Sequence, residues 1–161
     1  MFLMFQKLAV SLAVLCLVVS SGCSETEYDK ITTNAVTGRL TVNGAPATGA
    51  TVRFHPETPQ TGTKYPLLPS GKVDAEGVYQ LTTYEGPDGA PAGAYTVTVE
   101  WPDRNWRPPN GGMPPPPPDR LQGVYADPKK STIHLKVEEG ANEMAPIVLE
   151  NVKILKGSSL N

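Results

Sequence analysis

The chain has 161 residues, a formal net charge of −2, 39% hydrophobic residues and two cysteines. This length suits one domain of ordinary size with its own core. The weakly negative charge gives no electrostatic reason to expect nucleic acid as a partner, so we exclude nucleic-acid binding.

The amino-terminal residues have the three-part layout of a secretory signal. Lys7 and the amino terminus precede an apolar run from Leu8 to Val19, and small residues follow. A permanent membrane span needs roughly 18 to 20 apolar residues and this run has about twelve, so an uncleaved anchor is the less favoured alternative. We interpret residues 1–22 as a signal helix that is removed on export.

Cys23 follows Ser20, Ser21 and Gly22, a segment that resembles the lipobox of bacterial lipoproteins. The resemblance implies that the chain is cut before Cys23 and that lipid is attached there, although most lipoboxes carry Leu where this chain has Ser20. We therefore expect a protein that Cys23 anchors in a lipid bilayer. The alternative is ordinary cleavage, which releases a soluble protein with a free thiol. Because Cys16 lies in the removed segment, the mature chain has no internal disulfide.

Residues 23–35 are polar without apolar periodicity and predict a flexible tether. From residue 36 on, apolar and polar residues alternate with a period of two, which is typical of half-buried strands. Turns are expected at Asn43-Gly44, Asp74–Gly77 and Gly140–Asn142, and the second of these is expected to close a hairpin. The predicted strands are 36–42, 50–56, 72–73, 79–81, 94–101, 133–137 and 147–149. They predict an all-β fold, a single antiparallel β-sandwich of about seven strands over residues 36–150.

A proline-rich insert interrupts this pattern at residues 102–120. Its five successive prolines, Pro114 to Pro118, favour polyproline II, which spans roughly 15 Å at about 3.1 Å per residue. The tail at 151–161 is compatible with an edge strand or with a loose end.

The segments VTGRLTVNGAPATGATVRFHP, VDAEGVYQLTTY and PAGAYTVTVEW resemble the carboxypeptidase regulatory-like family. That family has a transthyretin-like or immunoglobulin-like β-sandwich, and VYADPKKSTIHLKVEEGANE looks like the last part of its small exported lipoproteins of planctomycete type. The resemblance covers nearly all of residues 36–150. It implies the fold and carries no catalytic residue, because its motifs are turn and core positions.

The residues that could carry catalysis or hold a metal do not form a recognised pattern. His55 and His134 lie on the outward phase of their strands, far apart in the sequence and without a cysteine partner. A zinc site needs three or four convergent ligands, and HExxH, GxSxG and CxxC are absent. We therefore expect no enzyme activity, no metal site and no cofactor.

Loop carboxylates give a second hypothesis, calcium binding. Asp74, Glu76 and Gly77 have the composition of a calcium loop but lack its further acidic ligands, so a turn is the favoured interpretation. The remaining loop acids considered as ligands are Glu85, Asp88, Asp119 and Asp127.

Three aromatic residues flank the insert, namely Trp101, Trp106 and Tyr125. Exposed rings beside a rigid loop could bind a partner protein or a glycan, whereas the favoured alternative has Trp101 capping the core and Trp106 packing on prolines. The expected function is a lipid-anchored, non-catalytic binding or structural module of the cell envelope, on the periplasmic side or at the cell surface. The alternative is a calcium-binding accessory domain of a surface-assembly or export machine.

Overall fold

The computed structural model describes residues 30–63, 65–107 and 115–155. The compact unit that carries the strands begins at Ile31. The signal peptide and Cys23 lie outside the described residues, as do residues 108–114 of the insert and 156–161 of the tail. Among the residues that are described, no helix is long and apolar enough to cross a membrane.

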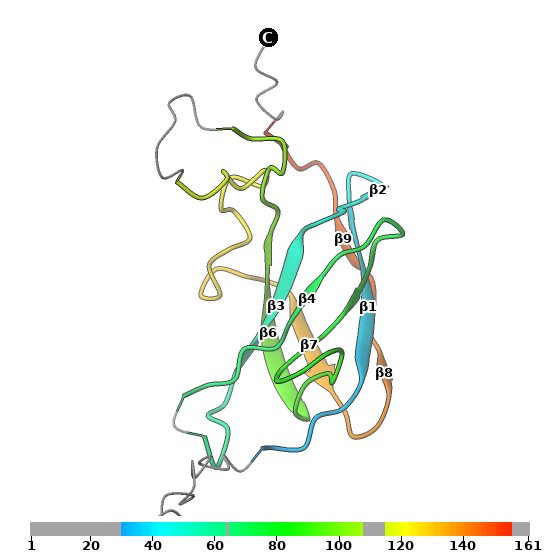
Figure 1. Ribbon diagram of the computed structural model, residues 1–161, viewed down its shortest axis with the longest axis vertical. Helices are drawn as coiled ribbons and strands as arrows, with labels where there is room; N and C mark the ends of the chain where they lie inside the picture. Colours follow the sequence, from blue (N-terminus) through cyan, green and yellow to red (C-terminus); the bar gives the residue numbers. More distant parts are fainter. Residues whose placement is uncertain (1–29, 64, 108–114, 156–161) are drawn as a thin grey trace, which may run out of the picture. The chain divides into compact units, whose positions relative to one another are not determined.

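Two sheets pack face to face, which confirms the all-β, sandwich-like prediction (Figure 1). Nine strands occur in the described part of the chain, two of them only two residues long. The first sheet contains β1 (Val36–Val42), β2 (Ala45–Pro46), β5 (Val78–Gln80), β8 (Asn142–Glu143) and β9 (Ile147–Leu149). The second has the order β4-β3-β6-β7, from β3 (Thr51–Pro56), β4 (Ser70–Lys72), β6 (Gly93–Glu100) and β7 (His134–Val137).

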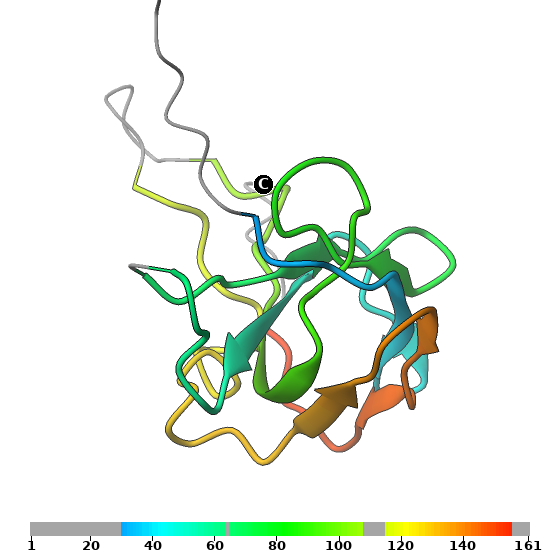
Figure 2. The same cartoon turned by 90° about the horizontal axis from the view of Figure 1, so that it is seen from below.

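The core lies between the sheets because their inward positions are apolar, as the alternation predicts. Tyr95, Val97 and Val99 of β6 are essentially fully buried, and so are the inward residues of β1. The Phe54 ring of β3 contacts Tyr95 in its own sheet, at 5.6 Å between ring centroids, and Tyr79 of the facing sheet, at 6.4 Å. The contact with Tyr79 joins the two layers. Figure 2 shows the backbone of the two sheets from one end.

Strand direction differs from the antiparallel prediction at one edge. β8 and β9 both pair with β1 in parallel, with Leu40 opposite Ile147 and Val42 opposite Leu149. The chain turns after β7, crosses to the other sheet and runs beside β1 in the same direction. Apolar alternation determines which face a strand buries but not its direction, so the sequence could not reveal this pairing.

The predicted hairpin at residues 72–81 also differs. Its turn forms as expected, because Asp74 Oδ1 accepts hydrogen bonds from the amides of Glu76 and Val78, and Gly77 has a φ of 82°. The two strands then enter different sheets, β4 beside β3 and β5 beside β1. An isolated bridge between Ser70 and Thr82 connects them, so this segment closes one side of the sandwich.

The two ends of the domain are formed by different segments of the chain (Figure 1). At one of them, Ile31 begins the domain beside the loop at 82–92. Its amide donates to the Tyr84 hydroxyl, and Asn34 bridges to Ala90. Residues 31–35, predicted as part of the tether, are therefore attached to the domain.

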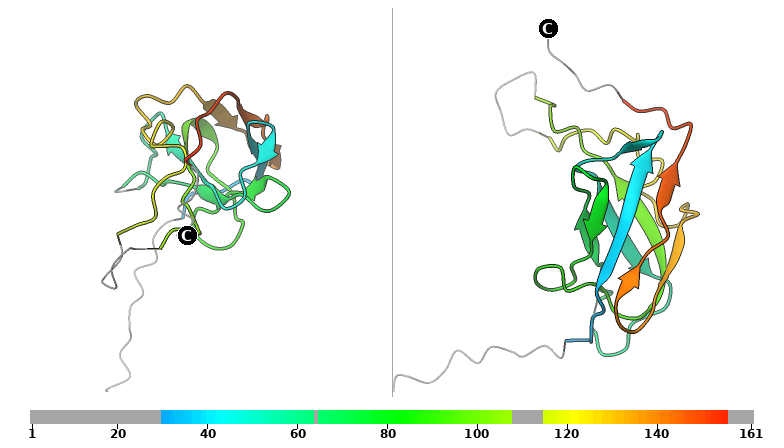
Figure 3. Two further views of the ribbon diagram at one scale, coloured as in Figure 1. Left: turned by 90° about the horizontal axis from the view of Figure 1, so that it is seen from above. Right: turned by 90° about the vertical axis from the view of Figure 1, so that its right-hand side faces the viewer.

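The described parts of the insert and of the tail lie at the opposite end (Figure 3). A bridge between Pro102 and Asp119 closes the base of the insert, and Pro115–Pro118 are exposed. Residues 151–155 form neither a strand nor a loose end. The Asn43 side chain exchanges two hydrogen bonds with the Val152 backbone, and the Leu155 amide donates to Arg120.

Candidate functional site

Polar side chains form a row across the outer face of the second sheet. His55 of β3 lies opposite Thr96 of β6, which in turn lies opposite His134 of β7. Residues directly opposite in a ladder share a face, so the two histidines lie on the same face two strands apart, about 9–10 Å between backbones. The outward orientation predicted for them is correct. Their placement in one row is a property of the strand order, which the sequence did not reveal.

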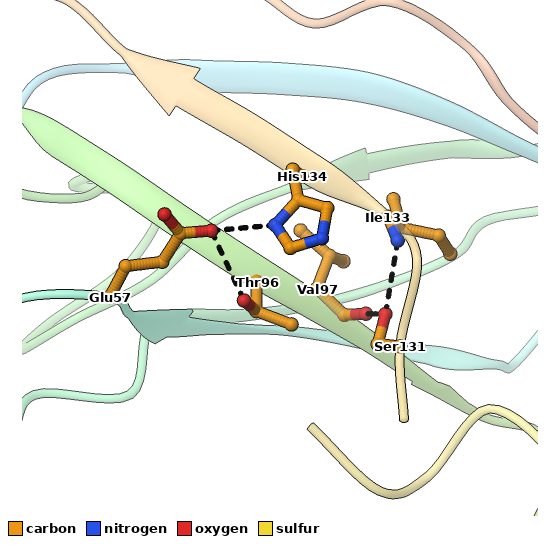
Figure 4. A network of polar contacts seen from close by, with 6 residues as sticks. All are labelled: Glu57, Thr96, Val97, Ser131, Ile133 and His134. Carbon is orange, nitrogen blue, oxygen red and sulfur yellow. Dashed lines mark hydrogen bonds and ion pairs between the residues drawn. The ribbon is translucent and has the colours of Figure 1, made fainter. Parts of the chain in front are cut away.

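Glu57 connects this row to the loop that follows β3. Its Oε1 atom lies 2.6 Å from Nδ1 of His134 and accepts a hydrogen bond of 3.2 Å from the Thr96 hydroxyl (Figure 4). The hydrogen bond from His134, followed by that from Thr96, holds the pKa of Glu57 below its usual value. The carboxylate is therefore ionised at neutral pH. The other oxygen, Oε2, has no hydrogen bond to any residue in the described ranges.

A second pair on this face has the residue types of a base and a nucleophile. Nε2 of His55 lies 2.9 Å from the Thr98 hydroxyl, within the range of such pairs. Burial lowers the pKa of His55, the Arg53 charge adds to this, and Glu100 opposes it. However, Thr98 is only 2% exposed although the alternation places it outward, so a substrate cannot reach its hydroxyl.

The loop after β3 forms an open pocket of about 380 Å³. This volume falls in the range of ligand pockets, about 300–1,000 Å³. The Gln60 side chain holds the loop in shape, since its Oε1 accepts from the Leu67 amide at 2.9 Å and its Nε2 lies 3.4 Å from the Tyr95 hydroxyl. The described lining residues are Pro56, Glu57, Thr58, Pro59, Gln60, Thr63, Tyr65 and Pro66.

Glu57 thus belongs to both features, the polar row and the pocket, and the sequence reasoning did not single it out. Its only signal in the sequence was its position directly after the His55-Pro56 end of a predicted strand. Thr96 and Gln60 gave no signal, because outward threonines and loop amides are common in any sandwich.

The loop aspartates considered as calcium ligands are instead committed to backbone turns. Asp88 accepts hydrogen bonds from the amides of Thr83 and Tyr84. Asp119 accepts from Trp101, Leu121 and Gly123, and Asp127 accepts from Lys129. Within the described ranges, no group of three or more His, Cys, Asp or Glu side chains is placed to hold a metal ion.

The structure describes all three aromatic residues beside the insert. Trp101 is 7% exposed, donates from Nε1 to the Thr48 carbonyl, and carries the Arg120 guanidinium 3.9 Å from its ring centroid. Trp101 therefore caps the core, as expected from the favoured alternative to partner binding. Tyr125 is half-buried and packs against the core, and Trp106 is half-buried in the insert. Their role in partner binding stays a prediction.

Comparison with known proteins found no match: no family model, curated protein or solved structure is significantly similar to this chain.

Proposed function

We propose that this chain is exported, anchored in a bilayer through lipid on Cys23, and acts as a non-catalytic binding or structural module of the bacterial cell envelope. The observation that carries this proposal is the sequence order at the amino terminus: an apolar run, small residues, then Cys23. The compact unit begins only at Ile31, which leaves a short segment between anchor and domain. The carboxypeptidase regulatory-like resemblance is part of the same proposal.

The hydrogen bonds of the loop carboxylates support a binding or structural role. Asp74, Asp88, Asp119 and Asp127 all accept hydrogen bonds from loop amides, which stabilises the loops at both ends of the sandwich. In the His55–Thr98 pair, the hydroxyl belongs to a residue that is only 2% exposed. A rigid sandwich with well-ordered loops is suited to presenting a binding surface.

The mass of the N-terminal peptide tests the anchor. We expect protein from the membrane fraction of a bacterial host to begin at Cys23 and to carry a diacylglyceryl group there, and we expect Cys23→Ala to abolish both the modification and the membrane association. The matched control is Ser21→Ala, which leaves the cysteine in place. Unmodified Cys23 in soluble protein would contradict the anchor and would indicate a secreted protein with a free thiol.

A variant that lacks Asn105 to Pro118 tests the insert as a partner-binding element. If this loop binds the envelope partner, crosslinking in cells recovers that partner with the intact protein and loses it with the variant. Recovery of the same partners with both proteins would exclude the loop and direct attention to the opposite end of the domain.

A further inference from the structure

We propose that the domain binds an extended peptide of a partner protein, with apolar residues two positions apart, at a site that its own residues 151–155 occupy in the structure. The inference rests on the proposed role as a binding module and names the class of its partner. Asn43, in the turn between β1 and β2, forms the site together with Arg120 and Gln122, which follow the proline-rich insert. We call these three residues the backbone clamp.

The backbone clamp binds the tail through the peptide groups of the tail and not through its side chains. Nδ2 of Asn43 donates to the Val152 carbonyl at 2.8 Å, and Oδ1 of Asn43 accepts from the Val152 amide at 2.9 Å. Nε2 of Gln122 donates to the Lys153 carbonyl at 2.7 Å. Because every peptide carries such backbone groups, the clamp can bind an extended segment of another chain in the same way.

The side chains of the tail alternate between the core and solvent. Val152 and Ile154 are half-buried and pack against the hydrophobic core, whereas Lys153 is exposed and Leu155 is 40% exposed. This period of two is that of an extended chain. The site therefore selects apolar side chains at two positions and accepts other residues between and after them.

The clamp is held in a fixed position by the residues around the base of the insert. Asp119 accepts hydrogen bonds from two amides of the turn that carries Gln122. The Arg120 amide donates to the Trp101 carbonyl, and the Arg120 guanidinium lies over the Trp101 ring. The Arg120 carbonyl accepts from the Leu155 amide of the tail at 2.9 Å. A preformed site of this kind lowers the entropic cost of binding.

Backbone strain is concentrated at the contact between the clamp and the tail. Within residues 30–63, 65–107 and 115–155, three residues other than glycine have a positive φ, namely Asn43 at 50°, Gln122 at 59° and Asn151 at 57°. Two of them belong to the clamp, and the third directly precedes Val152. Such conformations are uncommon outside glycine, and strained residues cluster where a protein holds a ligand or switches its conformation. Their positions are an independent sign of a binding site.

The tail is held in a way that permits exchange with a partner. Residues 151–155 form no strand, and the hydrogen bonds that Asn43 and Gln122 make to them are exposed to solvent. Segments with exposed hydrogen bonds open locally at a small free-energy cost. Because the tail belongs to the same chain, its effective concentration at the clamp is high, and it competes with a peptide in solution. A partner peptide is therefore expected to bind more tightly when the tail is weakened.

Amide chemical shifts measured by NMR on the full chain provide the test. The probe is the capped hexapeptide Glu-Asn-Val-Lys-Ile-Leu, which has the sequence of residues 150–155. The variant Val152→Pro weakens the tail, because it removes the amide that donates to Asn43. We expect the probe to shift the amides of Gly44 and Gly123 in this variant, with an affinity at least about tenfold higher than for the unchanged protein.

Two control peptides test the two features by which the site would recognise its ligand. One carries N-methylvaline in place of valine and so lacks the amide that the clamp binds. The other carries serine in place of isoleucine and so lacks the second apolar side chain. We expect each control peptide to bind at least about fivefold more weakly than the probe.

A matched pair of substitutions in the Val152→Pro protein tests the clamp itself. Asn43→Asp keeps an acceptor for the peptide but removes the donor, and we expect it to weaken binding of the probe at least about fivefold. Asn34→Asp makes the same chemical change at the other end of the domain and is expected to leave binding unchanged.

The absence of shifts at millimolar probe in folded Val152→Pro protein would overturn the proposal, as would equal binding of the probe and the N-methylated peptide. If Val152→Pro does not fold, Ile154→Ser replaces it, because that variant removes an apolar contact and keeps the hydrogen bonds of the clamp. Neither result would affect the mass measurement at Cys23, so the two proposals fail independently.

Discussion

Two buried tyrosines of the core differ in one hydrogen bond. The Tyr95 hydroxyl donates to the Pro91 carbonyl at 2.7 Å. The Tyr79 hydroxyl, on a side chain that is 1% exposed, has no partner within the described residues. It lies over Gly38, where an added Cβ atom would come within 2.4 Å of it. A buried polar atom without a partner costs about 1–3 kcal/mol, so Tyr79 is a weak point of the core.

Removing the Tyr79 hydroxyl is therefore expected not to destabilise the protein. We expect Tyr79→Phe to leave the free energy of unfolding unchanged or to raise it by up to about 1 kcal/mol, because the ring contacts with Phe54 remain. Tyr95→Phe is the matched control and should cost about 1–2 kcal/mol, since it leaves the Pro91 carbonyl unpaired. Urea unfolding of both variants measures the difference. A loss from Tyr79→Phe as large as that from Tyr95→Phe would mean that the Tyr79 hydroxyl has a partner.

At the scale of elements, the strands are short and the loops are fixed by close backbone contacts. The loop at 82–92 illustrates this. Asp88 accepts hydrogen bonds from backbone amides of this loop, and Ala90 pairs with Asn34 at the start of the domain. Gly89 passes so close to Asn34 that an added Cβ atom would lie 1.8 Å from its carbonyl oxygen. The contact between the entering chain and this loop therefore depends on a residue without a side chain.

Two glycines of this loop provide a matched test. Gly86 and Gly89 both have positive φ, 56° and 85°, but only Gly89 has neighbours within 4 Å of an added Cβ atom. We expect Gly86→Ala to cost about 1–2 kcal/mol of unfolding free energy from backbone strain alone. Gly89→Ala should cost more than about 4 kcal/mol, because Asn34 must also move. Thermal or urea unfolding measures the loss of unfolding free energy in each variant. Equal losses would show that residues 31–35 can move away from residue 89 without a free-energy cost.

At the scale of the whole molecule, the sandwich separates a tether end from an insert end. The first end carries the start of the described chain and residues 57–63, and the second carries residues 102–107, 115–120 and 151–155 (Figure 1). The sandwich therefore keeps these two groups of loops apart.

Stability of the whole domain should depend on pH at both extremes. Burial and the Arg53 charge hold the pKa of His55 below its ordinary value of 6.5. Below that pH the unfolded chain therefore binds more protons than the folded chain, and the free energy of unfolding decreases. The lowered pKa of Glu57 adds a further loss below about 4.5. Burial raises the pKa of Tyr79 and of Tyr95 above 10.0, so their contribution is complete below pH 10 and is lost as the pH rises further.

Unfolding free energies across a pH series measure this profile. We expect a plateau between about pH 6.5 and pH 10, with a decline on each side. His55→Gln keeps a polar partner for Thr98 and should flatten the decline just below pH 6.5, while leaving the alkaline limb unchanged. A stability that increases as the pH falls below 6.5 would contradict the direction argued for His55.

The sequence by itself determined the fold class, most strand positions and several turns. Alternation in VTGRLTV and AYTVTVE specifies which side chains are buried, and Asp74 and Gly77 specify a turn through local hydrogen bonding and positive φ. These features depend only on neighbours in the chain, so a sequence pattern can reveal them.

Only the tertiary structure decided which segments meet. It placed β8 and β9 parallel to β1, sent β4 and β5 into different sheets, and buried Thr98 on an outward position. It also brought His134 to Glu57, residues far apart in the sequence, and thereby formed the candidate pocket's charged wall. Such pairings follow from strand order and from the packing of whole layers, and no local alternation of residues encodes them.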